Sequence, residues 1–128
     1  MYYKCISCGK KFDVSRKLYT CPDCGSLLEI ELDLEKIKEE ISEKSLEEDC
    51  VSTWKYKPFY PIQDDSKIVT LDEGGTPLYS CDRLAEEIGM DELYVKFEAG
   101  NPTGSFKDRG MTIGVTKALE YGVDYVFS

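Results

Sequence analysis

Two closely spaced pairs of cysteines near the N-terminus constrain the fold of this chain more than any other feature. The first pair is Cys5-Ile-Ser-Cys8, and the second is Cys21-Pro-Asp-Cys24, after twelve intervening residues. A glycine follows each pair and permits the tight turn that directs backbone amides at the sulfurs. Four thiolates at this spacing suit a zinc ion held tetrahedrally in a closed structural site.

The segment around these cysteines is short. Residues 1–32 are too few to bury a sufficient core unless such a site holds them together. The pattern from Phe12 to Tyr19 predicts a short hairpin, and the pattern from Leu27 to Leu32 predicts a further strand. The sequence therefore predicts a zinc ribbon over residues 1–32, with structural zinc bound by Cys5, Cys8, Cys21 and Cys24.

Other interpretations of the cysteines stay open. Two disulfides need an oxidising compartment, whereas the chain opens with no secretion-signal pattern. A redox role is disfavoured by the matched pairs, and iron can occupy the same tetrahedral sulfur cage. A zinc ribbon can also bind nucleic acid, but this one carries four acidic and five basic residues and no basic face stands out. A structural or docking role is therefore favoured.

Composition limits the possible partners. The chain has 128 residues and a net charge of −9, which argues against nucleic acid or an anionic membrane as a partner. No apolar run approaches the length of a transmembrane span, so a cytoplasmic protein is expected. The chain has no histidine, so any general base or metal ligand must be Cys, Asp, Glu, Lys or Tyr.

An acidic connector follows over residues 33–53. Residues 33–44 predict a helix with Asp33 as its N-cap and a narrow apolar stripe, made of Leu34, Ile37 and Ile41. Ser45-Leu-Glu-Glu48 resembles a capping box that starts a second short turn. Cys50 is expected to be a small buried hydrophobic residue.

Residues 54–128 alternate between strand and helix patterns. Strands are predicted at 68–71, 93–98 and 123–128, and helices at 81–88 and 111–122. Ser80 is the expected cap of the first helix. The expected buried face of the second comprises Met111, Val115, Ala118 and Leu119, and Gly110 and Gly114 are expected to allow close approach of a neighbour. This order predicts an open α/β sheet, so the fold class is α/β.

The loop between the second strand and the second helix carries the candidate chemistry. Its sequence is Asn101-Pro-Thr-Gly-Ser-Phe-Lys-Asp-Arg-Gly-Met111, which places Lys107 near a helix N-terminus. The helix dipole disfavours a cation there, and a lysine with a lowered pKa suits Schiff-base chemistry because the neutral amine is the nucleophile. A surface lysine in a capped first turn is the alternative. Arg109 is expected to pair with Asp108 or another carboxylate, and Lys117 to be solvated.

This loop resembles the pyridoxal-phosphate lysine motif of threonine synthases. Three further segments resemble the family in the same order: Trp54-Lys-Tyr56, Glu73-Gly-Gly-Thr-Pro-Leu78 and Tyr94-Val-Lys-Phe-Glu98. Lys55 stands where the family has arginine, and many members carry a cysteine-rich N-terminal extension. Trp54 and Tyr56 are expected to pack.

The resemblance implies a fold type II enzyme domain that begins at residue 54, with pyridoxal phosphate on Lys107 as the catalytic residue and Phe106 flanking the cofactor. It implies conversion of O-phospho-L-homoserine and water to L-threonine and phosphate, with a homo-oligomer possible. Because family members run to several hundred residues, residues 54–128 are expected to be the first part of that domain. The chain alone is expected not to complete a catalytic site.

Two other functions stay open at this point. A related enzyme on the same scaffold, such as a cysteate synthase or a threonine dehydratase, shares the lysine motif. A free-standing zinc-ribbon interaction module is the alternative from outside the enzymes.

Overall fold

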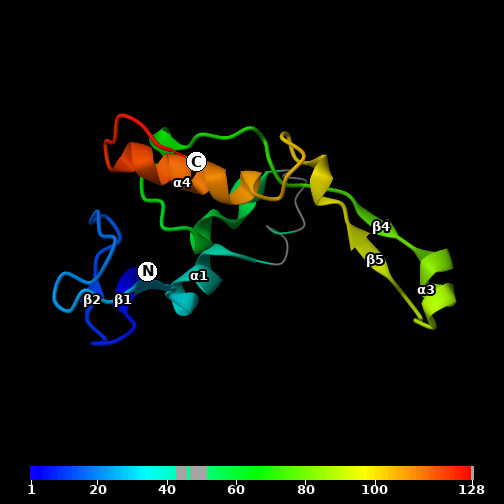
Figure 1. Cartoon of the computed structure of the whole chain (residues 1–128), viewed down its shortest axis with the longest axis horizontal. Coiled ribbons are helices and arrows are strands. Elements are labelled where there is room, and N and C mark those ends of the chain that lie inside the picture. Colours follow the sequence, from blue (N-terminus) through cyan, green and yellow to red (C-terminus); the bar gives the residue numbers. More distant parts are fainter. Residues whose placement is uncertain (43–45, 47–51, 128) are drawn as a thin grey trace.

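The computed structural model describes residues 1–42, 46 and 52–127. It has α/β character and an elongated outline (Figure 1). The cysteine-containing N-terminal module lies at one end, close to the long helix α4, and a small arm of two strands and one helix extends to the other end. In the described part of the chain, no helix has the length and apolar character needed to cross a membrane.

The N-terminal module, residues 1–31, is built on a three-stranded antiparallel sheet. Its strands are β1 (Tyr2–Cys5), β2 (Lys11–Phe12) and β3 (Leu28–Glu31), in the order β2-β1-β3. The strand expected at 27–32 therefore forms. The hairpin expected from Phe12 to Tyr19 does not, because the chain leaves β2 after Phe12 and turns Val14 inward, where it is 3% exposed.

Helix α1 (Leu34–Glu40) follows the module and begins where the sequence predicted, but it ends at Glu40, before the predicted end at residue 44, because the backbone is extended at Ile41. The Asp33 carboxylate accepts a hydrogen bond from the Lys36 amide at 3.2 Å, as expected of an N-cap. Ile37 is buried, whereas Leu34 of the expected stripe is 55% exposed. The expected capping box at 45–48 is described only at Leu46, and Cys50 lies outside the described residues.

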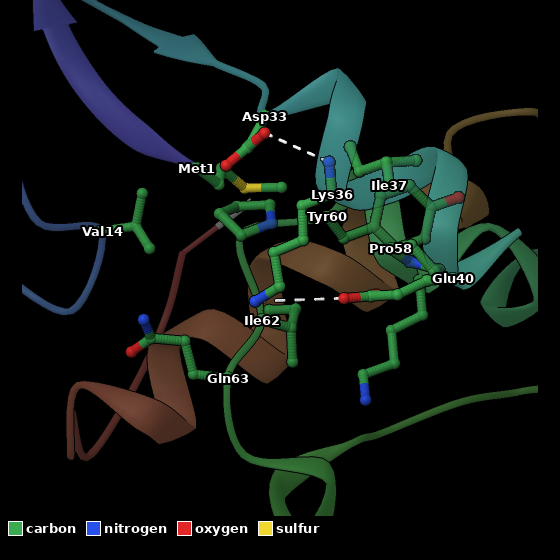
Figure 2. A pocket seen from close by; sticks show the side chains of 12 residues that line it. Met1, Val14, Asp33, Lys36, Ile37, Glu40, Pro58, Tyr60, Ile62 and Gln63 are labelled. Atoms are coloured by element: carbon green, nitrogen blue, oxygen red, sulfur yellow. Dashed lines mark hydrogen bonds and ion pairs between the residues drawn. The ribbon is translucent and has the colours of Figure 1, made fainter.

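Two 3-10 helices, η1 (Thr53–Phe59) and η2 (Asp65–Lys67), connect α1 to the rest of the chain. Trp54 packs edge to face on Tyr60, with ring centroids 5.9 Å apart, as expected of a packing residue. A hollow of about 310 Å³ lies where the N-terminal module, α1 and the 57–63 segment meet (Figure 2). Its buried apolar lining comes from all three: Val14, Ile37 and Ile62. The three segments therefore share one small core.

The arm consists of β4 (Leu78–Ser80), α3 (Asp82–Ile88) and β5 (Tyr94–Lys96). The two strands pair antiparallel, with Leu78 opposite Lys96 and Ser80 opposite Tyr94. Helix α3 begins after Cys81, so Ser80 is not its cap; α3 ends at Gly89, whose φ of +73° suits glycine. Within the described residues, the open sheet expected from the sequence is thus reduced to this two-stranded ladder.

The strands expected at 68–71 and 123–128 do not form over the described residues. For residues 68–71 the cause is visible, because the Val69 backbone bonds to a helix and not to a neighbouring strand. The Val69 amide donates to the Thr116 hydroxyl at 3.1 Å, and the Thr112 hydroxyl donates to the Val69 carbonyl. The segment is therefore held against α4 (Asp108–Glu120) by side chains.

These bonds also correct the expected buried face of α4. Thr112 and Thr116 are buried, while Met111 is 46% and Leu119 is 42% exposed. A Cβ added at Gly110 or Gly114 would meet no described atom within 4 Å, so the close approach expected at these glycines is absent from this part of the structure. The helix begins at Asp108, three residues earlier than the apolar pattern predicted.

Candidate functional site

The lysine loop, residues 97–108, links β5 to α4 through a short 3-10 helix, η3 (Glu98–Gly100). A turn follows, in which the Gly104 amide donates to the Asn101 carbonyl at 2.8 Å. The buried Asp108 carboxylate closes the loop, because it accepts from the Thr103 amide at 2.8 Å and from the Thr103 hydroxyl at 2.5 Å. These hydrogen bonds hold the loop against the first turn of α4.

Lys107 occupies the N-cap position of α4. Its backbone amide donates to the Ser105 hydroxyl at 3.2 Å, and its side chain is exposed. Within residues 1–42, 46 and 52–127, its Nζ atom has no hydrogen-bonding or ionic partner. The neighbouring Phe106 ring is 64% exposed. An unengaged primary amine beside an exposed aromatic ring suits covalent attachment of a planar aldehyde cofactor.

The other two lysines near the loop are engaged. Lys96 donates to the Thr76 carbonyl, and Lys117 donates to the Pro61 carbonyl at 2.7 Å and to Glu120 at 2.8 Å. The Lys117 side chain is 12% exposed, so the expectation that it is solvated is wrong. Pro61 lies 56 residues from Lys117 in the chain and Glu120 lies three residues away. No local sequence pattern predicts the contact with Pro61.

Arg109 pairs with Glu98 through two parallel hydrogen bonds. The Nε atom lies 2.8 Å from Oε2, and an Nη atom lies 2.9 Å from Oε1. The Arg109 guanidinium and then the Thr76 hydroxyl lower the pKa of Glu98 to about 2, against burial that raises it. The expected structural pairing of Arg109 with a carboxylate is confirmed, with Glu98 as the partner and not Asp108.

Asn101 joins this loop to the segment that contains Glu73-Gly-Gly-Thr-Pro-Leu78. Its side-chain amide donates to the Glu98 carbonyl at 2.7 Å, and its side-chain oxygen accepts from the Gly74 amide at 3.0 Å. Gly74 has φ +103°, and an added Cβ would lie 2.6 Å from the Thr53 amide nitrogen. Only glycine fits at position 74. Asn101 itself is 4% exposed, and the sequence analysis had assigned it no role.

Glu73 is a second buried group that the sequence did not single out. It is fully buried, and its carboxylate accepts from the Leu71 amide at 2.8 Å and the Thr70 hydroxyl at 3.1 Å. It also lines an apolar hollow of about 310 Å³ beside the loop, but Lys107 and Phe106 do not. A glutamate directly before two glycines was the available signal, since such a position allows the side chain to fold back onto its own turn.

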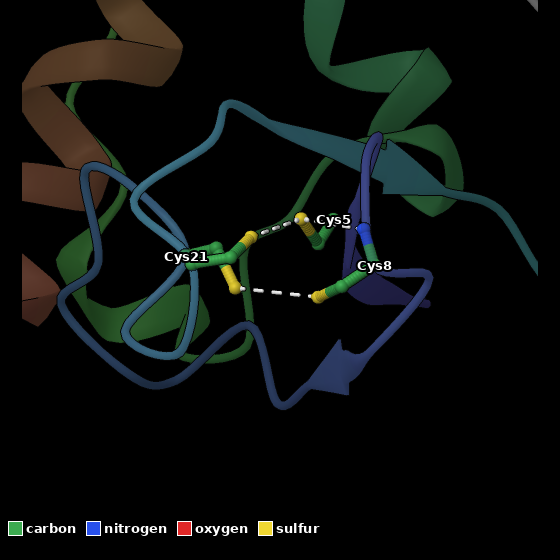
Figure 3. Close-up of side chains that lie close together, drawn as sticks. Cys5, Cys8 and Cys21 are labelled. Carbon is green, nitrogen blue, oxygen red and sulfur yellow. Dashed lines mark hydrogen bonds between the residues drawn. The ribbon is translucent and has the colours of Figure 1, made fainter.

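The four cysteines of the N-terminal module come together (Figure 3). Their sulfur atoms all lie within 4.8 Å of one another, with Cys5 and Cys24 separated by 3.4 Å and Cys8 and Cys21 by 3.7 Å. Zinc–sulfur bonds of about 2.3 Å place tetrahedral sulfurs about 3.8 Å apart. The cluster can therefore hold one metal ion, and the four cysteines are free thiols without disulfides.

The electrostatics of the cluster favour a thiolate at two positions. The Ser26 amide and hydroxyl lower the pKa of Cys24 to about 6. The Cys8 amide, which lies 3.4 Å from the Cys5 sulfur, lowers the pKa of Cys5. At Cys8 the Lys10 amide lowers the pKa, but the Cys5 sulfur and burial raise it, and the net value is about 12. Since a thiolate is the form that binds a metal, Cys5 and Cys24 are the two ligands that these contacts prepare.

Comparison with known proteins shows which enzymes the chain is similar to. The family model described as pyridoxal-phosphate dependent enzyme matches residues 69–127. Threonine synthase of Methanocaldococcus jannaschii is 56% identical over 126 residues, which cover 98% of this chain and 31% of that protein. Threonine synthase of Methanosarcina acetivorans is 53% identical over 127 residues, which cover 98% of this chain and 30% of that protein.

A third, shorter match is also to a threonine synthase. Threonine synthase of a Synechocystis strain is 49% identical over 72 residues, or 56% of this chain and 19% of that protein. The chain spans less than a third of each of these relatives. No solved structure matches it significantly. These names favour the threonine synthases over cysteate synthases, threonine dehydratases or a free-standing zinc module. Residues 69–127 therefore match the pyridoxal-phosphate-dependent enzymes, and over 98% of its length the chain is similar to threonine synthases.

Proposed function

We propose that this chain supplies the cofactor lysine of a threonine synthase, which converts O-phospho-L-homoserine and water to L-threonine and phosphate. One observation carries the proposal. Lys107 stands in the family motif, and of the three lysines near the loop it is the one whose amine has no partner in the described part of the chain. The identity of 56% and 53% to two threonine synthases supports it.

The residues of the chain divide the work as follows. Lys107 would hold the aldehyde of pyridoxal phosphate through its amine and, as a free amine, would move protons at the substrate α and β carbons. Phe106 would flank the cofactor ring. Pyridoxal phosphate supplies the electron sink that these proton transfers need. Glu98, Asn101 and Asp108 hold the loop that presents Lys107.

The proposal extends to the N-terminal module. Residues 1–32 form a zinc ribbon with structural zinc on the four cysteines, residues 33–53 are a connector, and residues 54–128 are the first part of a fold type II enzyme domain. The sulfur separations and the free thiols support this assignment. A reducing, cytoplasmic location is part of the proposal, because free thiols bind metal only where they are not oxidised.

Borohydride reduction of the complete enzyme that contains this chain, loaded with pyridoxal phosphate, tests the site directly. Peptide mapping should place the reduced adduct on Lys107 and leave Lys96 and Lys117 unmodified. An adduct on either of those lysines, with Lys107 unmodified, would refute the assignment. For the module, elemental analysis should find about one zinc per chain. Protein that folds with two disulfides and no metal would exclude the zinc ribbon.

A further inference from the structure

The last turn of α4 touches the N-terminal module through Tyr121, the C-cap residue of the helix. Its hydroxyl lies 2.8 Å from the Tyr3 hydroxyl of β1 and donates to the carbonyls of Val14 at 3.2 Å and Arg16 at 3.1 Å. Burial and then the bond to Tyr3 raise the pKa of Tyr121. The hydroxyl therefore stays neutral and keeps the proton that it donates.

Two neighbours of Tyr121 hold a second segment. The Glu120 carboxylate accepts from the amides of Gln63 at 2.6 Å and Asp64 at 2.7 Å. Lys117 pairs with Glu120 and donates to the Pro61 carbonyl, and its ammonium lies 4.9 Å from the centre of the Tyr121 ring. We call Lys117, Glu120 and Tyr121 the helix latch. Its side chains at 117 and 120 are 12% and 8% exposed, so both charges depend on these partners.

The carbonyls that Tyr121 binds belong to a loop that the cysteines close. Val14 and Arg16 lie between Cys8 and Cys21 in the chain. Apart from the cysteines, the start of this loop is held to the sheet by the β1–β2 pairs Tyr3 with Phe12 and Lys4 with Lys11. The Cys5 amide also donates to the Lys10 carbonyl at 2.9 Å, and the Lys11 ammonium contacts Tyr2 and Glu31. A metal ion on the four sulfurs would fix both ends of the loop, and metal binding and local folding are coupled in sites of this kind.

The other end of the same helix carries Lys107. Helix α4 has 13 residues and is therefore about 20 Å long. A continuous helix of this length moves as a rod, so fixing its last turn limits the tilt of its first turn. We infer that the N-terminal module is a positioning element for Lys107, and that metal in the cysteine cluster tightens the helix latch and so restrains α4. The role of this restraint in positioning Lys107 for the cofactor rests on the proposed function. The link between metal binding and the restraint of α4 does not.

Hydrogen exchange of the whole chain tests the link. We compare the zinc-loaded protein with protein stripped by a chelator. Amides of residues 108–121 should exchange on the order of fivefold faster without zinc, the size expected for loss of about one net hydrogen bond. Tyr121→Phe should speed exchange similarly in the zinc-loaded protein and add little once zinc is removed. Unchanged protection of α4 on zinc removal, while residues 2–31 lose theirs, would overturn the inference.

Zinc affinity supplies a second readout that a role confined to capping the helix would not change. Because coupling between two sites is reciprocal, Tyr121→Phe should weaken zinc binding on the order of fivefold in chelator competition. Tyr125→Phe, at a tyrosine that is 74% exposed, should leave it unchanged. Equal affinities of Tyr121→Phe and the parent would overturn the inference. Neither readout involves the cofactor, so failure here is separate from failure of the Lys107 assignment.

Discussion

The lysines at the two ends of helix α4 differ in exposure and in their hydrogen-bonding partners. At the first turn, Lys107 is exposed and its amine has no partner in the described part of the chain. At the last turn, Lys117 is 12% exposed and has both a carboxylate and a carbonyl as partners. A polar group that serves the fold is satisfied, whereas an amine that serves covalent chemistry must stay available. Under the proposed function, the comparison separates a lysine that serves chemistry from one that serves stability along one helix.

The two ends also differ in their ion pairs. Arg109 and Glu98, at the lysine end, have side chains 28% and 29% exposed, whereas Lys117 and Glu120 are 12% and 8% exposed. Solvent screens the first pair more than the second. The Lys107 end of α4 therefore depends more on its hydrogen-bonded loop, and the Lys117 end depends more on a buried charge pair.

Replacing Lys107 with alanine should give the largest contrast between the two ends of α4. Lys107→Ala should abolish covalent attachment of pyridoxal phosphate, measured as complete loss of the visible absorption of the lysine-bound cofactor. Its free energy of unfolding should change by less than about 0.5 kcal/mol, because an exposed side chain without partners is removed. Lys67→Ala, at another exposed lysine, is the matched control and should retain the absorption. A Lys107→Ala protein that still carries the cofactor covalently would remove the functional half of the comparison.

Replacing Gly74, which contacts the loop at the Lys107 end of α4, should give the second largest effect. In Gly74→Ala the new methyl group would meet the Thr53 amide nitrogen at 2.6 Å while φ is +103°, so the free energy of unfolding should fall by about 2–3 kcal/mol. Gly114→Ala is the control within α4. It has open space around its Cβ and should raise stability by about 0.5–1 kcal/mol. Denaturant titration measures both, and a Gly74→Ala protein as stable as the parent would contradict this geometry.

Lys117→Ala reverses the result expected for Lys107. Removing its ammonium leaves the buried Glu120 carboxylate and the Pro61 carbonyl with fewer partners, so stability should fall by about 1–2 kcal/mol. Cofactor attachment should persist. Denaturant titration and the absorption of the cofactor-loaded protein give the two values. Loss of attachment with unchanged stability would mean that the roles of the two lysines are interchanged.

The sequence predicted local features well and distant contacts poorly. The cysteine spacing anticipated the sulfur cluster, and Asp33 caps α1 as expected, because both depend on residues a few positions apart. The contact of residues 68–71 with Thr112 and Thr116, and the latch at Lys117, join residues more than 40 positions apart. No periodicity encodes which distant backbone a hydroxyl or an ammonium will meet.

The same distinction applies within the candidate site. The motif located Lys107 and the fact that Arg109 pairs with a carboxylate, but not which one. Asp108 is adjacent in sequence, yet its carboxylate is already bound by Thr103, which leaves Glu98 for the guanidinium. Choosing between them required the positions of all four side chains.

The Arg109–Glu98 pair gives the smallest effect, visible on acidification. Because the pKa of Glu98 is lowered from its usual 4.5 to about 2, its contribution to stability is complete above about pH 4.5 and is lost as the pH falls toward 2. Glu98→Gln cannot titrate, so its stability should fall less than that of the parent between pH 5 and pH 3 in denaturant titrations. Glu86→Gln, at an exposed carboxylate of α3, should follow the parent. If Glu98→Gln and the parent show the same acid dependence, the half-buried Arg109–Glu98 pair contributes nothing to folding, and the hydrogen bonds of Asn101 and Asp108 alone hold the loop that presents Lys107.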